Sequence, residues 1–176
     1  MNLRKINSII SLITTTLLLI HSISLALWML SKGAIPQVPT FLSIALIPTT
    51  ILHAVVSIII MIITNKGSKE SKGRKYKKMH VPTILQRITG VLLIIFTWLH
   101  VAGTVGIMQP PQIIHAIVPP IFFLTVMIHV SISASKAFIT LGIGNAKFVK
   151  IFDISIKAFC AITLIADIIG FYLFVC

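Results

Sequence analysis

The most informative stretch of the sequence is ILQRITGVLLIIFTWLHVAGTVGI, residues 84–107. A bilayer core is roughly 30 Å thick, so a helix that rises ~1.5 Å per residue needs about 20 apolar residues to cross it. The stretch is long enough, and it carries His100 among its apolar side chains. Because a polar ring is costly in hydrocarbon, the stretch predicts a transmembrane helix with a functional residue inside it.

Four other segments share this length and apolar character, and only Asp153, Lys157 and Asp167 interrupt the last of them. The four segments are residues 6–30, 41–63, 113–135 and 148–175. The sequence therefore predicts an all-α polytopic membrane protein with five transmembrane helices, forming a single domain over residues 1–176.

The composition agrees with this fold class. Hydrophobic residues make up 57% of the chain and charged residues 10%, against about 25% charged in soluble domains. The mean hydropathy is +1.06. These values exclude soluble and disordered chains, and the net charge of +12 does not indicate nucleic-acid binding. The two cysteines form no CxxC pattern, which excludes a zinc ribbon, a Cys-ligated iron–sulfur cluster and covalent haem.

Basic residues gather on one side of the membrane if the five helices alternate in direction. The connection from Asn65 to Pro82 carries seven Lys and Arg against one Glu, and only Lys32 falls on the opposite side. Because cytoplasmic loops are enriched in Lys and Arg, we expect a cell-membrane protein with its N-terminus inside and its C-terminus outside. This connection either only orients the chain over anionic lipid or also docks a cytoplasmic partner.

One histidine lies inside each of the first four predicted helices: His21, His53, His100 and His129. Counting from the nearer helix end places His21 ~14 Å and His100 ~10 Å from the outer end. The same count places His53 ~15 Å and His129 ~9 Å from the inner end. The first and third helices therefore carry an imidazole in the outer half of the membrane, and the second and fourth carry one in the inner half.

Imidazole pairs at two depths suit two haems stacked across the bilayer. A neutral imidazole binds iron, and two of them leave no open position for oxygen or substrate. Because the chain has no CxxCH, the haems would be non-covalent b-type. The alternative interpretation is that each histidine only hydrogen-bonds to a neighbouring helix. The depth matching favours haem, since each buried ring is costly.

His115 leaves an ambiguity in the outer pair. It lies 14 residues before His129, the spacing of a different two-haem design in which two helices each carry two histidines. No second predicted helix has such a pair. His115 could replace His21 or His100 as an outer ligand, but we interpret it as an interfacial residue and a candidate quinone contact.

The first four predicted helices form a repeat of two hairpins. Their histidines are separated by 32 residues in the first hairpin and 29 in the second. Aligning His21 on His100 places Ser11 against Gly90. Two such hairpins would form a pseudo-twofold four-helix bundle with cofactors in its core, and the fifth helix would pack outside.

The string LQRITGVLLIIFTWLHVAG, from Leu85 to Gly103, resembles the Arg-Ser/Thr-Gly…His helix of succinate dehydrogenase and fumarate reductase membrane anchors. Five helices with one histidine in each of the first four also resemble the single-chain di-haem anchor of this succinate:quinone oxidoreductase group. The resemblance covers residues 5–140. Here the motif opens the third helix instead of the first, and Ser8 stands where the pattern has Arg. These departures leave open a di-haem cytochrome b that serves another dehydrogenase.

The resemblance implies cofactors, partners and ligand roles. His21 and His100 would hold the outer haem b, and His53 and His129 the inner one. Quinone would be a diffusible substrate, and flavoprotein and iron–sulfur subunits would bind on the cytoplasmic side. The chain would have no catalytic residue of its own and would serve as a non-catalytic or quinone-reactive subunit.

Two other functions compete with electron transfer. A small transporter is one, because Pro48, Pro119 and Pro120 can break helices as transporters require. Against it, the first four helices carry no carboxylate, and the repeat is parallel and not inverted. The other is a structural or assembly subunit without a cofactor.

Asp167 is the deepest carboxylate, ~12 Å from the outer end of the fifth helix. It is either a proton acceptor beside quinone chemistry or a hydrogen-bonded helix contact. The second interpretation is favoured because the sequence shows no relay partner. Asp153 and Lys157 are expected to pair at i, i+4.

Overall fold

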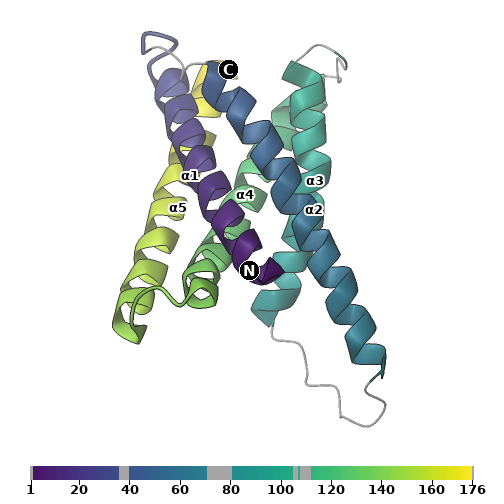
Figure 1. Cartoon of the computed structure of the whole chain (residues 1–176). Coiled ribbons are helices and arrows are strands. Elements are labelled where there is room, and N and C mark those ends of the chain that lie inside the picture. Colours follow the sequence, from purple (N-terminus) through teal and green to yellow (C-terminus); the bar gives the residue numbers. More distant parts are fainter. Residues whose placement is uncertain (1, 36–39, 71–80, 105–106, 108–111, 176) are drawn as a thin grey trace.

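The chain folds into five long α-helices (Figure 1). The computed structural model describes residues 2–35, 40–70, 81–104, 107 and 112–175. All five helices are long and apolar enough to cross a membrane, and no strand occurs in these residues. The predicted all-α, five-span fold class is confirmed. The helices are α1 Leu3–Leu30, α2 Thr40–Glu70, α3 Val81–Thr104, α4 Gln112–Leu141 and α5 Ala146–Val175.

Helix ends are where the structure departs most from the predicted segments. α2 continues from residue 63 to Glu70, and α4 continues from residue 135 to Leu141. Hydropathy detects the hydrocarbon core, whereas a helix can extend beyond it through polar residues. Between α4 and α5, Gly142 and Gly144 adopt φ values of 74° and 81°, a conformation that ends helices and that glycine tolerates best.

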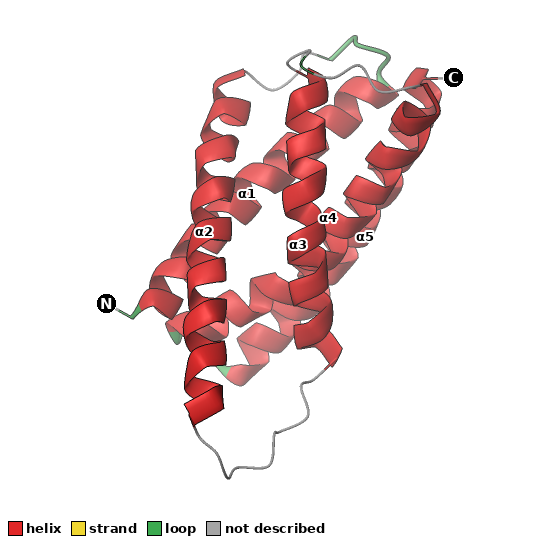
Figure 2. Ribbon diagram, turned by 90° about the vertical axis from the view of Figure 1, so that its right-hand side faces the viewer, coloured by secondary structure: helices red, strands yellow, loops and turns green. Residues whose placement is uncertain are grey.

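Three helices form the packed centre of the molecule. α1, α4 and α5 pack against one another, α2 packs on α1, and α3 packs on α4. Figure 2 shows α2 and α3 in front of the other three helices. Within the described residues, α2 and α3 are not a packed pair. A closed four-helix bundle is therefore not established, and α5, expected on the outside, supplies part of the core.

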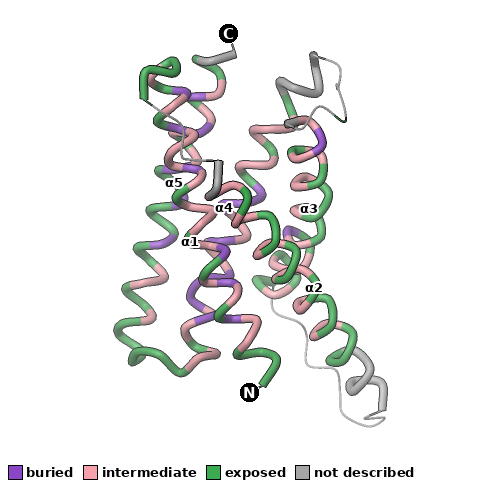
Figure 3. Tube along the Cα trace, turned by 45° about the horizontal axis from the view of Figure 1, so that its top comes forward, coloured by how far each residue is buried: buried purple, intermediate pink, exposed green. Residues whose placement is uncertain are grey.

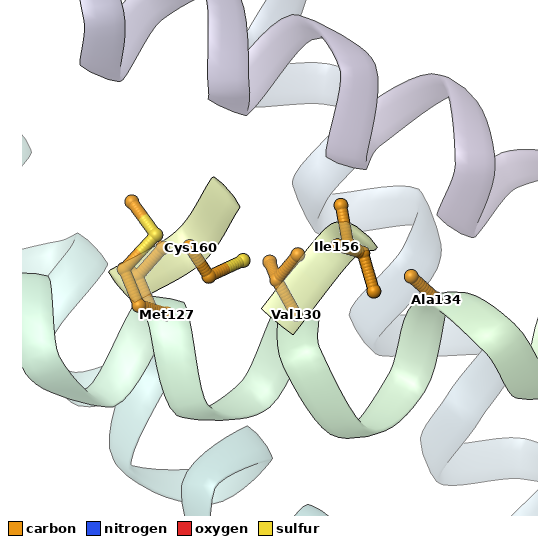
Figure 4. Close-up of a cluster of buried hydrophobic side chains, with 6 residues drawn as sticks. Met127, Val130, Ala134, Ile156 and Cys160 are labelled. Atoms are coloured by element: carbon orange, nitrogen blue, oxygen red, sulfur yellow. The ribbon is translucent and has the colours of Figure 1, made fainter. Parts of the chain in front are cut away.

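The core is built mainly by α4 and α5. Figure 3 shows buried residues along α1, α4 and α5, while α2 is mostly exposed or half-buried. Association of helices in lipid depends on close packing, which small side chains allow. Figure 4 shows the main cluster, which consists of Val126, Met127, Val130, Ala134, Ile156 and Cys160.

The three prolines do not interrupt their helices. Pro48 lies within α2, and Pro119 and Pro120 lie within α4. Neighbouring helices and hydroxyl groups can compensate for the backbone hydrogen bonds that prolines remove in membrane proteins. The broken helices that would favour a transporter are absent at these three positions.

Candidate functional site

The structure brings the four intramembrane histidines together in two pairs. His100 of α3 interacts electrostatically with His21 of α1, and His129 of α4 interacts with His53 of α2. In the described chain, neither α1 and α3 nor α2 and α4 form one of the closely packed helix pairs. The pairs are those expected from depth along the helices, and their ligation of iron stays a prediction.

His129 is held in place by residues of α3. Its Nδ1 atom lies 3.0 Å from Thr89 Oγ1. A Cβ atom at Gly90 would lie 3.4 Å from Cε1 of His129. Glycine at this position therefore leaves room for the imidazole beside α3. The sequence pattern included Thr89 and Gly90 as motif residues but did not indicate the contact of Thr89 with His129.

His53 has a different environment. Its Nδ1 atom is buried and has no hydrogen-bond partner in the structure. A buried nitrogen without a partner is unfavourable by about 1–3 kcal/mol. Such an atom in a native structure requires an explanation, and a ligand that uses the ring is one.

The register of the first hairpin matches that of the second. Ser57 Oγ donates to Asn7 Oδ1 at 3.3 Å. Four residues further along α1 and four residues back along antiparallel α2 bring Ser11 opposite His53. In the second hairpin, Gly90 lies against the α4 histidine. The register set by the Asn7–Ser57 contact therefore agrees with the alignment that places Ser11 on Gly90.

The outer pair is less tightly held than the inner pair. His21 Nδ1 lies 3.5 Å from Ser43 Oγ, at the limit of a hydrogen bond. The His100 ring lies 5.5 Å from the Phe122 ring, centre to centre, and His100 is exposed in the isolated chain. Both outer imidazoles therefore have nitrogen atoms that are weakly engaged by the protein.

Asp167 lies in the packing of α5 on α1, where it contacts the residue that follows His21. Its side chain is 0% exposed. Ser22 Oγ donates to Asp167 Oδ2 at 2.5 Å, while Oδ1 has no partner. The sequence showed no partner for this carboxyl group, and the structure supplies one. Because Ser22 follows His21, the contact connects α5 to the helix that carries an outer histidine.

Two further polar contacts join helices near the inner ends. Asp153 pairs with Lys157 at 2.5 Å, as predicted, and also accepts from Ser135 Oγ of α4 at 2.5 Å. Lys136 of α4 donates to Gln86 Oε1 of α3 at 2.6 Å. These contacts fix α3, α4 and α5 relative to one another on the side of the inner histidines.

Several sequence-based candidates are not placed by the structure. His115 lies in α4, but its side chain is outside the described residues. His80 and the basic residues from Lys72 to Lys78 are outside them as well. The expected interfacial role of His115 and the expected docking role of the basic segment are therefore not tested.

The described residues contain no cluster of three or more His, Cys, Asp or Glu side chains that could hold a metal ion by themselves. The site offers imidazoles in twos, which is the number that a six-coordinate haem iron takes from a protein. None of the family models, curated proteins or solved structures compared with the chain matches it.

Proposed function

We propose that the chain is a di-haem cytochrome b membrane anchor. It passes electrons between the quinone pool and a peripheral flavoprotein/iron–sulfur dehydrogenase of the succinate dehydrogenase or fumarate reductase type. The observation that carries this proposal is one imidazole in each of four helices, with the buried Nδ1 of His53 unpartnered and the ring of His129 seated against α3 at Thr89 and Gly90.

The residues at the inner pair fit a haem ligand site. The buried Nδ1 of His53 has no partner in the protein, and Gly90 leaves space against the ring of His129. Each imidazole can offer one nitrogen lone pair while neutral. His53 and His129 would hold the inner haem, and His21 and His100 the outer one.

The chain's own residues would bind, orient and insulate these groups. When bound, a bis-imidazole haem supplies one-electron iron chemistry and leaves no position open to oxygen. Contacts such as that between Thr89 and His129 orient the rings, which raises ligand basicity and affinity. The apolar helices together with the surrounding lipid would exclude water from the histidines, and solvent exclusion and nearby hydrogen bonds tune the potential of a bound iron.

The expected topology supports an electron path to the cytoplasm. The basic connection from Asn65 to Pro82 places the N-terminus and the inner haem on the cytoplasmic side under the positive-inside rule. The flavoprotein and iron–sulfur subunits would dock there, with the C-terminus on the opposite side of the cell membrane. Lys and Arg would steer an acidic partner surface towards the inner haem.

Asp167 and His115 are the candidates for contact with quinone or its protons. The bond from Ser22 supports the interpretation of Asp167 as a helix contact. The free Oδ1 atom keeps the proton-acceptor role open to test. His115, near the start of α4, is the interfacial candidate on the outer side.

The runner-up is a di-haem cytochrome b that serves a different dehydrogenase, because the histidine pairs suit it equally well. A transporter is supported less well, since α2 and α4 continue through their prolines. A cofactor-free assembly subunit is supported less well, because it would not explain why the buried Nδ1 of His53 has no hydrogen-bond partner.

A reduced-minus-oxidised absorption spectrum of the purified full-length protein tests the proposal. We expect a b-type α-band and two haems per chain by pyridine haemochromogen assay. Electron transfer from succinate through co-expressed dehydrogenase subunits then separates the proposed partner from another dehydrogenase. Protein that is folded but free of haem after expression with ample haem would refute the proposal.

A further inference from the structure

The hydroxyl group of Thr89 lies between carbonyl groups of its own helix and the ring of His129. Its Oγ1 lies 2.8 Å from the carbonyl oxygen of Leu85 and 3.2 Å from that of Gln86. A carbonyl oxygen can only accept, and a hydroxyl has a single hydrogen to donate. The shorter contact, 2.8 Å to Leu85, favours donation of this hydrogen within α3. In that arrangement Thr89 Oγ1 is the acceptor towards His129 Nδ1, which lies 3.0 Å away.

This direction determines where the hydrogen of the imidazole lies. If Thr89 accepts, Nδ1 of His129 must carry the hydrogen. A neutral imidazole has one N–H, so Nε2 then carries the lone pair.

We propose that Thr89 is a positioning residue that holds His129 in the tautomer whose Nε2 is free to ligate. The side chain of Thr89 is only 4% exposed, so water does not compete for the bond. The partner of Nε2 rests on the proposed function, in which it is the inner haem iron. The tautomer itself does not depend on haem.

The first hairpin lacks this device. In the alignment that places Ser11 on Gly90, the counterpart of Thr89 is Ile10. The side chain of Ile10 has no atom that could accept a hydrogen bond from an imidazole. Accordingly, Nδ1 of His53 has no partner. In the inner pair, the protein therefore sets the tautomer of His129 before any ligand binds, but it does not set the tautomer of His53.

The first experiment uses the haem-free full-length chain in lipid nanodiscs with ¹⁵N-labelled histidine. Signals of His129 are identified by their loss in His129→Gln. We expect hydrogen on Nδ1 and a lone pair on Nε2. Thr89→Val removes the hydroxyl and keeps the shape, and should shift the tautomer ratio by up to about fivefold towards hydrogen on Nε2, the factor for one ordinary hydrogen bond. Thr89→Ser should restore the wild-type ratio.

Thr163→Val is the matched control. Thr163 is also buried, at 5% exposed, and its hydroxyl bonds to the Phe159 carbonyl in α5 at 3.0 Å. This variant should leave the His129 signals unchanged. Hydrogen on Nε2 in the wild-type chain, or an unchanged ratio in Thr89→Val, would overturn the proposal.

The second experiment titrates the haem-loaded chain and its variants. An Nδ1–H that donates a hydrogen bond raises the basicity of the ligand, which favours oxidised iron. Thr89→Val should therefore shift one of the two midpoint potentials upwards, and Thr89→Ser and Thr163→Val should shift neither. Equal shifts in Thr89→Val and Thr163→Val would assign Thr89 a merely structural role. A wild-type chain that takes up no haem would refute the proposed function, while the tautomer measurement would still decide the role of Thr89.

Discussion

Ser22 of α1 donates a 2.5 Å hydrogen bond to Oδ2 of Asp167 of α5, and this bond is buried in the packing between the two helices. One turn further along α5, a Cβ at Gly170 would lie 3.1 Å from Cβ of Met29, so the helices approach closely there. Polar contacts and close packing are the two forces that associate helices in lipid. The Ser22–Asp167 bond therefore holds α5 against the helix that carries His21.

Ser22→Ala should destabilise the protein by about 1–3 kcal/mol, because it leaves the buried carboxyl group of Asp167 without its partner. Unfolding in mixed micelles, followed by circular dichroism, measures this change. Ser8→Ala is the control, since Ser8 is buried on the same helix but bonds only to the Arg4 carbonyl of its own helix. Equal destabilisation by both variants would contradict the importance of the interhelical bond.

Asp167→Asn should keep two haems per chain and near-normal quinone-linked turnover. The amide oxygen of asparagine can still accept from Ser22, so the helix contact survives while the ability to exchange a proton is lost. Haem content and quinone reduction in membranes measure the two properties separately. Loss of turnover with both haems intact would instead assign Asp167 the role of proton acceptor.

Replacing His53 or His129 with leucine should remove the inner haem and leave the outer one. Loss of one axial ligand breaks bis-imidazole coordination, and no other described histidine lies beside that pair. His21→Leu and His100→Leu should likewise remove only the outer haem. Haem per chain by the pyridine haemochromogen assay measures both effects.

His80→Leu is the control for these variants and should keep two haems. If His115→Leu loses the outer haem while His21→Leu or His100→Leu keeps it, the outer pair must be reassigned with His115 as a ligand. Two haems in every single variant would end the assignment.

Much of the fold follows from the sequence because one physical length governs it. Bilayer thickness sets the helix length, and counting along each helix sets the depth of His21, His53, His100 and His129. The pairs predicted from depth are also the ones whose members influence each other electrostatically in the structure. The pairing of Asp153 with Lys157 follows in the same way from the helical repeat.

Contacts between helices could not be predicted in the same way. Lipid and protein core are both apolar, so the hydrophobic pattern does not reveal which face of a membrane helix meets a neighbour. The bond from Ser22 to Asp167 and the one between Thr89 and His129 depend on helix rotation and register. The Asn7–Ser57 contact supplies that register only once the helices are placed.

Gly90→Val should lower occupancy of the inner haem and leave the outer haem in place. A Cβ at this position would already be in van der Waals contact with His129 Cε1 at 3.4 Å, so we expect the two additional methyl groups of valine to press on the ring. Overpacking of this kind typically costs about 1–3 kcal/mol. Haem titration into the purified chain measures the loss.

Gly103→Val is the matched control for this prediction. It places the same side chain on the same helix, but a Cβ at Gly103 would meet nothing within 4 Å. It should therefore keep both haems. Equal losses in the two variants would point to the helix propensity of valine and not to contact with His129.

Neutralising Lys75, Lys77 and Lys78 to glutamine should weaken association with co-expressed flavoprotein and iron–sulfur subunits and leave two haems per chain. Complementary charge mainly speeds and orients docking, and salt screens it. The loss should therefore be largest at low ionic strength, and the variant should show a shallower salt dependence than the wild-type chain. Co-purification from membranes across a salt series measures this. Lys32→Gln, on the opposite side of the expected topology, should have no effect. Wild-type assembly and turnover in the triple variant would return the segment to the role of orienting the chain in the membrane.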